Sequence, residues 1–97
     1  MEMDSLAEIK HNLGKLMELP PKELELKAYY NLLLQELQHI EIEIIKITQK
    51  HGLKTVAEFD AWLESGKIQE AEGWEDFFIL DALEFKRTQI KNMLTNF

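Results

Sequence analysis

Apolar residues recur every three or four positions over most of the chain, the spacing typical of amphipathic α-helices. The longest series lies in the middle of the chain and continues without a break for three heptads. Its members are Leu26, Tyr30, Leu33, Leu37, Ile40, Ile44 and Ile47. A helix over residues 22–51 would be about 45 Å long at 1.5 Å per residue, so we expect it to pack against another long helix.

Local signals predict where the helices begin and end. Ser5 with Glu8, and again Thr55 with Glu58, have the spacing of a capping box, in which each side chain satisfies a backbone N–H of the other residue. Pro20-Pro21 separates the first helix from the second. These signals predict helices over about 5–19, 22–51, 56–65 and 74–95, in a single domain of residues 1–97.

Glycines and β-branched residues refine this prediction. Gly52 and Gly66 suit helix ends because glycine readily takes the left-handed conformation, whereas Gly14 lies inside the first pattern and costs about 1 kcal/mol relative to alanine. The run Ile42 to Ile47 alternates as a strand does, but the unbroken heptads around it favour a helix.

The last helix carries a broader apolar stripe, interrupted by Lys86-Arg87, which indicates contact with more than one neighbour. The predicted fold class is therefore all-α. We expect an antiparallel helical hairpin or bundle of two long helices, with a short N-terminal helix and a short connecting helix. The polar segment from Lys67 to Gly73 is expected to be a connector with one apolar anchor, Ile68.

The charge of the chain is strongly uneven. Residues 1–57 hold nine acids and seven lysines, residues 58–84 hold nine acids and Lys67, and residues 85–97 hold three bases, so the formal net charge is −7. Because no basic stripe is available to neutralise phosphates, direct nucleic-acid binding is disfavoured. The acidic block is either a solvated face or a docking surface for a basic partner, and the sequence leaves both open.

Membrane insertion and export are not expected either. The apolar runs are far shorter than the roughly 18 residues that a membrane-spanning helix needs. The acidic N-terminus does not have the basic and apolar regions of a signal peptide. The sequence contains no cysteine, so it offers neither a disulfide framework nor a thiolate metal site. We therefore expect a soluble cytoplasmic protein.

The residues do not form a recognisable catalytic, metal-binding or cofactor-binding motif. His11, His39 and His51 are far apart in sequence, unlike the closely spaced histidines of zinc sites. Glu36 with Glu43, or Asp81 with Glu84, could share a helix face, but exposed helices commonly carry such pairs. The prediction is a protein without enzymatic activity, cofactor or metal, in which His51 has a structural or solvent role at a helix end.

Aromatic residues lie within the acidic block, where they either fill the core or anchor a partner. For the second interpretation we select tryptophans, one phenylalanine and the acids beside them as candidate partner-binding residues. They are Trp62, Glu70, Glu72, Trp74, Glu75, Asp76 and Phe78.

From about residue 50 to 94 the chain resembles a group of small acidic helical proteins of archaea and bacteria. The matching positions are His51-Gly52, Thr55, Glu58, Phe59, Gly66, Trp74, Glu75 and Ala82-Leu83. Some proteins of that group are taken to be antitoxins encoded beside a small toxin. The resemblance implies a neutraliser of a small basic partner protein.

Two functional hypotheses remain. In the first, the acidic block and its tryptophans bind a basic protein, in the manner of an antitoxin. In the second, the heptad positions from Leu26 to Ile47 mediate self-association, as in a homodimeric structural or adaptor protein.

Overall fold

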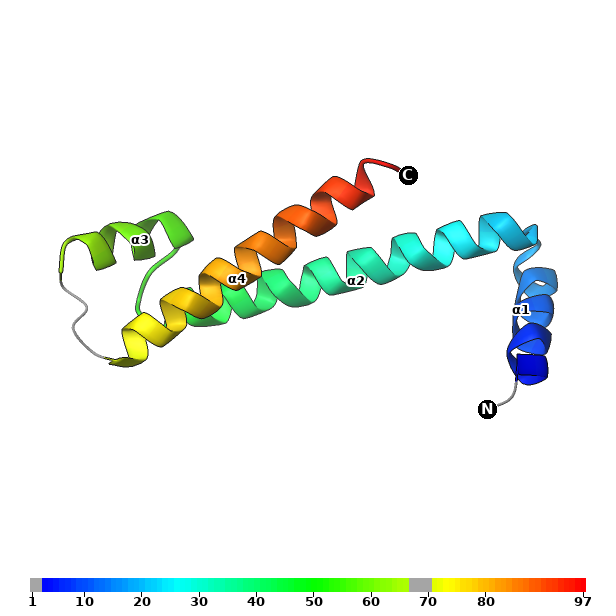
Figure 1. Ribbon diagram of the computed structural model, residues 1–97, viewed down its shortest axis with the longest axis horizontal. Coiled ribbons are helices and arrows are strands. Elements are labelled where there is room, and N and C mark those ends of the chain that lie inside the picture. Colours follow the sequence, from blue (N-terminus) through cyan, green and yellow to red (C-terminus); the bar gives the residue numbers. More distant parts are fainter. Residues whose placement is uncertain (1–2, 67–70) are drawn as a thin grey trace.

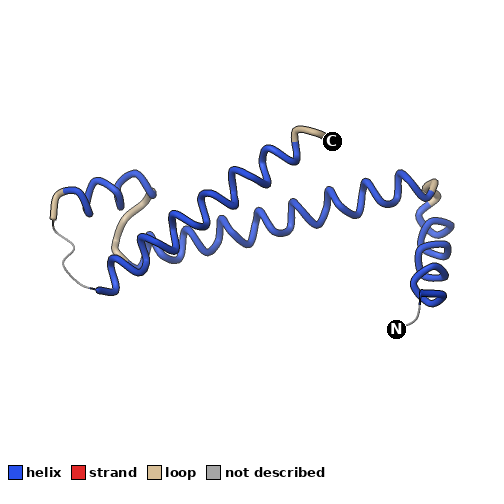
Figure 2. Tube along the Cα trace, in the orientation of Figure 1, coloured by secondary structure: helices blue, strands red, loops and turns tan. Residues whose placement is uncertain are grey.

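In the computed structural model, which describes residues 3–66 and 71–97, the chain forms four α-helices. They are α1 (Met3–Met17), α2 (Pro21–Lys50), α3 (Val56–Glu64) and α4 (Ala71–Leu94), and no strand occurs in the described ranges. Short loops join α1 to α2 and α2 to α3 (Figure 2). The prediction of an all-α fold is confirmed, and the β-branched run near Ile45 is helical as expected.

Most helix boundaries lie one to three residues from the predicted ones, and two of these differences change the interpretation of a local signal. α1 begins at Met3, so Ser5 already lies inside the helix and the predicted start at Ser5 is wrong. α4 begins at Ala71, which places Gly73 inside its first turn rather than in a connector. The predicted anchor Ile68 lies outside the described residues.

The end of α2 is closed by a glycine, as predicted. Gly52 has a φ of 70°, its N–H donates to the carbonyl of Gln49 at 2.9 Å, and the N–H of Leu53 donates to the carbonyl of Thr48 at 2.9 Å. These two bonds define a Schellman motif, which satisfies carbonyls that the helix leaves free.

The end of α1 has the same backbone arrangement without a glycine in the left-handed position. Glu18 has a φ of 56°, its N–H donates to Lys15 at 3.3 Å, and the N–H of Leu19 donates to the Gly14 carbonyl at 3.0 Å. A Cβ on Gly14 would lie 3.2 Å from the carbonyl oxygen of Leu19 and 3.8 Å from the side chain of Leu24. Gly14 therefore permits the close return of the chain toward α2.

The start of α3 uses the predicted capping residues. The N–H of Glu58 donates to the hydroxyl of Thr55 at 3.1 Å, and the carboxylate of Glu58 accepts from the N–H of Lys54 at 2.9 Å. The Glu58 carboxylate thus bonds to the residue before Thr55. Both bonds supply partners for N–H groups at the helix start.

The core lies where α4 packs beside the C-terminal half of α2 and α3 packs against both. Figure 1 shows these three helices together at one end of the molecule. The buried members of the core are Ile40 and Ile44 of α2, Phe59 of α3, and Leu80 and Ile90 of α4. Phe59 is fully buried. Three of the four helices therefore contribute to one apolar cluster.

Ion pairs cross between α4 and α2 beside this core. Lys86 Nζ lies 2.8 Å from a carboxylate oxygen of Glu36, and Arg87 Nε lies 3.4 Å from Glu41. The hydrogen bond from Lys86, together with its positive charge, lowers the pKa of Glu36. The two bases that interrupt the apolar stripe of α4 are thus used to pair that helix with α2.

The molecule is long and open rather than a closed bundle. It measures 58 × 29 × 17 Å, and its Cα radius of gyration is 19.6 Å. A compact chain of this length would have a radius of about 12.5 Å. The extension arises because α4 covers only part of α2, while α1 lies across the other end of α2 (Figure 1).

Candidate functional site

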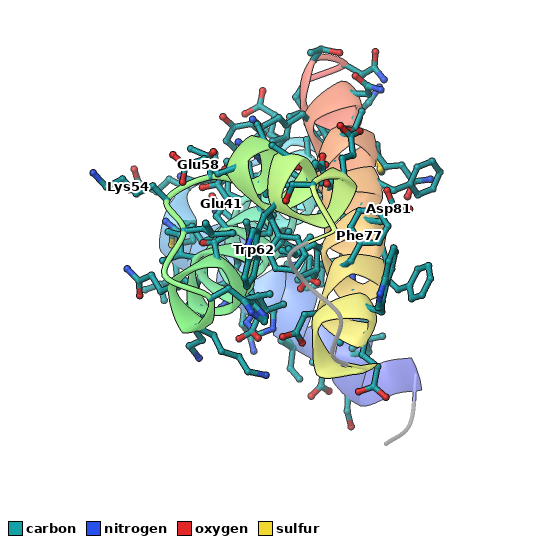
Figure 3. The ribbon with its side chains drawn as sticks, turned by 90° about the vertical axis from the view of Figure 1, so that its left-hand side faces the viewer. Glu41, Lys54, Glu58, Trp62, Phe77 and Asp81 are labelled. Atoms are coloured by element: carbon teal, nitrogen blue, oxygen red, sulfur yellow. The ribbon has the colours of Figure 1, made fainter. Side chains whose placement is uncertain are left out.

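A groove between α3 and α4 combines an apolar floor with an acidic rim. Its volume is about 340 Å³, and its apolar lining comes from Val56 of α3 and from Trp74, Phe77 and Leu80 of α4. In Figure 3, Phe77 lies on α4 beside α3, whereas Lys54 and Glu58 lie on the side of α3 away from α4. We call this feature the acidic groove.

Four carboxylates line the acidic groove: Asp60 and Glu64 from α3, and Asp81 and Glu84 from α4. Within the described part of the chain, none of the four is paired with a basic side chain. Asp60, Glu64 and Asp81 are exposed, and Glu84 is half-buried. Their negative charge is therefore directed toward solvent and is available to a basic ligand.

Helical spacing explains how these acids meet. Asp60 and Glu64 are four residues apart on α3, and Asp81 and Glu84 are three residues apart on α4, so each pair shares one helix face. Leu80 is almost fully buried beneath them, which anchors the α4 side of the groove to the core. The groove thus depends on the packing of α3 against α4.

A second polar cluster joins the end of α2 to the start of α4. One carboxylate oxygen of Asp76 accepts from Nε2 of His51 at 2.7 Å and from Nζ of Lys50 at 3.1 Å. The His51 ring also packs edge-on against Phe59, at a centroid distance of 5.0 Å, and in a tilted arrangement against Trp62, at 5.6 Å. This Lys50–His51–Asp76 cluster supports the structural role predicted for His51.

Burial and hydrogen bonding act in opposite directions on Asp76. Burial raises its pKa, whereas hydrogen bonds from His51 and Lys50 and their positive charges lower it, and the net result is a pKa below the usual value. The ionised form of this buried carboxylate is therefore the one that the fold stabilises.

The structure separates the candidate partner-binding residues into two groups. Trp74, Glu75 and Phe78 are exposed on α4, and Phe78 has 64% of its surface accessible. Trp62 is half-buried against the core, and Asp76 is buried in the cluster with His51. Glu70 lies outside the described residues, as does the side chain of Glu72.

The heptad positions of α2 are divided in a similar way. Ile40 and Ile44 are buried, and Leu33, Leu37 and Ile47 pack against the same core. In contrast, Leu26 and Tyr30 are exposed, although the Tyr30 ring meets the edge of Phe97 at a centroid distance of 5.6 Å. The chain itself therefore covers the C-terminal part of the series and leaves the N-terminal part open.

Of the residues that line the acidic groove, only Trp74 was among the partner-binding candidates chosen from the sequence. Asp81 and Glu84 were identified only as a pair sharing a helix face, and Asp60, Glu64 and Phe77 were not selected as binding residues. The same i, i+3 and i, i+4 spacing would have indicated each acidic pair, but their convergence depends on the packing of α3 beside α4.

Neither a metal-binding cluster nor a membrane-spanning helix occurs among the described residues. They contain no group of three or more His, Cys, Asp or Glu side chains placed to hold a metal ion. Among them, no helix has the length and apolarity required to cross a membrane.

A model of the uncharacterized protein MJ0235 family matches residues 1–97, the whole length of the chain. The chain belongs to the MJ0235 family. No curated protein and no solved structure matches it. A functional proposal for this MJ0235-family chain therefore has to come from its own residues and geometry.

Proposed function

We propose that the chain is a non-enzymatic protein-binding module whose acidic groove takes a basic, amphipathic segment of a partner protein. An antitoxin-like neutraliser of a small basic protein is the biological role that we favour. The observation that supports this proposal is the convergence of four carboxylates, none of them paired with a base among the described residues, around an apolar floor.

The composition of the groove fits such a segment. Val56, Phe77 and Leu80 offer an apolar floor for aliphatic side chains, while the carboxylates around them suit lysine or arginine. Trp74 lies at the groove with 45% of its surface exposed, and tryptophan is enriched among residues that dominate binding energy. A partner helix with one basic and one apolar face matches both components.

The net charge of −7 should help to attract a basic partner before contact. Long-range attraction of this kind raises association rates and weakens as salt is added. In this proposal α2 and α4 form an antiparallel hairpin that holds α3 in place, and the hairpin is the rigid support of the groove.

A synthetic amphipathic peptide with lysines on one face and leucines on the other tests the proposal. The matched control peptide carries glutamates in place of the lysines. We expect the basic peptide to bind in isothermal titration calorimetry and to change the fluorescence of Trp74, and the acidic peptide to do neither. Binding should weaken as salt is raised from low to physiological concentration.

A pair of variants tests whether the groove itself binds the peptide. Asp81→Lys places a positive charge at the groove, whereas Glu8→Lys makes the same change of net charge on an exposed position of α1. We expect Asp81→Lys to weaken peptide binding about tenfold, which corresponds to 1.4 kcal/mol, and Glu8→Lys to have a much smaller effect. Equal weakening by both variants would show general charge attraction and would refute the assignment to the groove.

Self-association along the whole heptad series of α2, the alternative function, retains less support. Most of the heptad positions already pack within the chain, which leaves only the N-terminal turns of α2 for another copy.

A further inference from the structure

A second groove lies between α1 and the first turns of α2. These turns lie at the end of the molecule opposite α3 (Figure 1). The volume of the groove is about 520 Å³. Its apolar lining residues are Leu6, Ala7, Ile9 and Leu13 of α1 and Leu24, Ala28 and Tyr29 of α2. We call this feature the N-terminal groove.

The N-terminal groove exposes most of its apolar side chains. Leu6, Ile9 and Tyr29 have 61%, 51% and 57% of their surfaces exposed, and Leu24 alone among the seven apolar lining residues is buried. The side chain of Lys10 on α1 forms an ion pair with Glu25 on α2 and so links the two helices. The ion pair therefore places the apolar face of α1 beside α2, while most of that face remains exposed to solvent.

α1 needs more packing than this contact provides. Within the described residues α1 packs against α2 and against no other helix. A helix of 15 residues is only marginally stable by itself in water, and Gly14 weakens it further. A partner that covers the apolar face of α1 would supply the missing burial.

The total surface agrees with this conclusion. The accessible surface is 7664 Å² for a mass of 11.4 kDa, whereas a folded monomer of that mass exposes about 5,800 Å². The excess is about 1,900 Å², which is more than the roughly 800 Å² that each partner buries in a standard interface. The chain therefore exposes enough additional surface for a stable dimer.

The charge of this end favours a second copy of the same chain as the partner. Residues 5–32 carry four glutamates and four lysines, so two such surfaces can meet without net repulsion. The acidic block of residues 58–84 would repel a second copy of itself, because it contains nine acids and one lysine. A two-fold interface requires a surface that complements itself, and the charge-balanced N-terminal end meets that requirement better than the acidic block does.

We propose that the N-terminal groove is a homodimer interface in which α1 and the first half of α2 from each of two chains enclose one shared apolar core. The two acidic grooves then lie at the outer ends of the dimer. Each remains open to a basic partner, so the dimer would present two binding sites.

Sedimentation analysis and light scattering over a range of protein concentrations test this proposal. We expect a dimer that dissociates on dilution. The double variant Ile9→Asp, Leu13→Asp should raise the dissociation constant at least about tenfold, because the shared core would have to bury unpaired charges. Both side chains are already exposed in the single chain, so the variant should keep its α2–α3–α4 core.

A control variant distinguishes the N-terminal groove from any other apolar surface. Phe78→Asp, Phe85→Asp changes two exposed side chains of α4, outside the N-terminal groove, and should leave the dimer intact. Circular dichroism should show that both double variants retain most of their helix. The single variant Lys15→Cys allows one spin label to be attached to each chain, because the natural sequence contains no cysteine. The labelled protein should show dipolar coupling between the two labels of the dimer.

A wild type that stays monomeric at all concentrations would overturn the proposal, whether the groove then takes a lipid surface or a different protein. A dimer that survives the Ile9→Asp, Leu13→Asp change would also overturn it. So would a dimer that is lost only in the Phe78→Asp, Phe85→Asp variant, because the interface would then lie on α4.

Discussion

Replacing Asp76 by asparagine should destabilise the protein at neutral pH, and the loss should shrink as the pH falls. Asparagine has nearly the same shape as aspartate but carries no charge, so the change removes both ion pairs of the Lys50–His51–Asp76 cluster. The residue is only 8% exposed, so solvent cannot replace the lost interactions. The variant therefore tests whether the cluster stabilises the contact between α2 and α4.

The size of the effect follows from the two interactions. A hydrogen bond that involves a charged group contributes about 1.5–3 kcal/mol, and the asparagine oxygen can still accept a weaker bond from His51. The Lys50 side chain is 48% exposed, so its contribution is discounted to about 0–1 kcal/mol. We expect a loss of about 2 kcal/mol in the free energy of unfolding at pH 7.

The pH dependence has a definite sign. The pKa of Asp76 is lowered in the folded state, so its ionised form stabilises the fold at every pH above the unfolded value of about 3.9. That stabilisation is lost as the pH falls through the folded pKa. The difference between wild type and Asp76→Asn should therefore be full at pH 7 and should decrease below about pH 4.

Urea unfolding followed by circular dichroism measures this difference. Helical proteins of this size lose about 1–3 kcal/mol per molar urea, so the midpoint should fall by about 1 M at pH 7. Protein concentration must be held constant because association would shift the midpoint. Asp81→Asn, an exposed position without a basic partner in the described residues, should change the free energy by less than about 0.5 kcal/mol. An unchanged midpoint for Asp76→Asn at pH 7, or an equal difference at pH 3, would refute the reasoning.

Three further predictions concern the core and the helix ends, and thermal or urea unfolding measures each of them. Phe59→Ala removes a fully buried ring from the centre of the core and should cost about 3–5 kcal/mol; a cost below about 1 kcal/mol would mean that α3 does not close the core. Gly52→Ala should cost about 1 kcal/mol, because a Cβ there meets no atom within 4 Å and the left-handed φ is the only penalty; no loss would contradict the Schellman motif after α2. Glu18→Gly should stabilise by about 0.5–1 kcal/mol, since glycine adopts the φ of 56° without strain, and a loss of stability would show that the side chain has a further role.

The sequence predicted the secondary structure well because the signals that decide it are local. The end of α2 at His51-Gly52 and the start of α3 at Thr55 depend on bonds between residues at most five positions apart. The heptad series correctly outweighed the alternating isoleucines, since several turns of helix contribute to one apolar face. At Ser5 the same reasoning was wrong, because the residues before it also adopt the helix.

The candidate site was predicted less well, because it depends on how the helices pack. Asp76 and Asp81 belong to the same acidic block and the same helix, but five residues of helix turn them to different faces. Asp76 is directed to His51, 25 residues earlier in the chain, whereas Asp81 lies at the acidic groove. Trp62 and Trp74 differ in the same way, since the first packs against the core and the second is exposed.

By itself, then, the sequence determined four helices, most of their limits and an acidic second half, because spacing, capping and charge are properties of neighbouring residues. Only the tertiary structure decided which of the described acids pair with a base and which line the acidic groove. It also decided that α4 covers the heptad positions around Ile40 and leaves α1 and the start of α2 uncovered. The physical reason is that burial depends on the register of helices far apart in the chain, and each helix pattern is compatible with more than one neighbour.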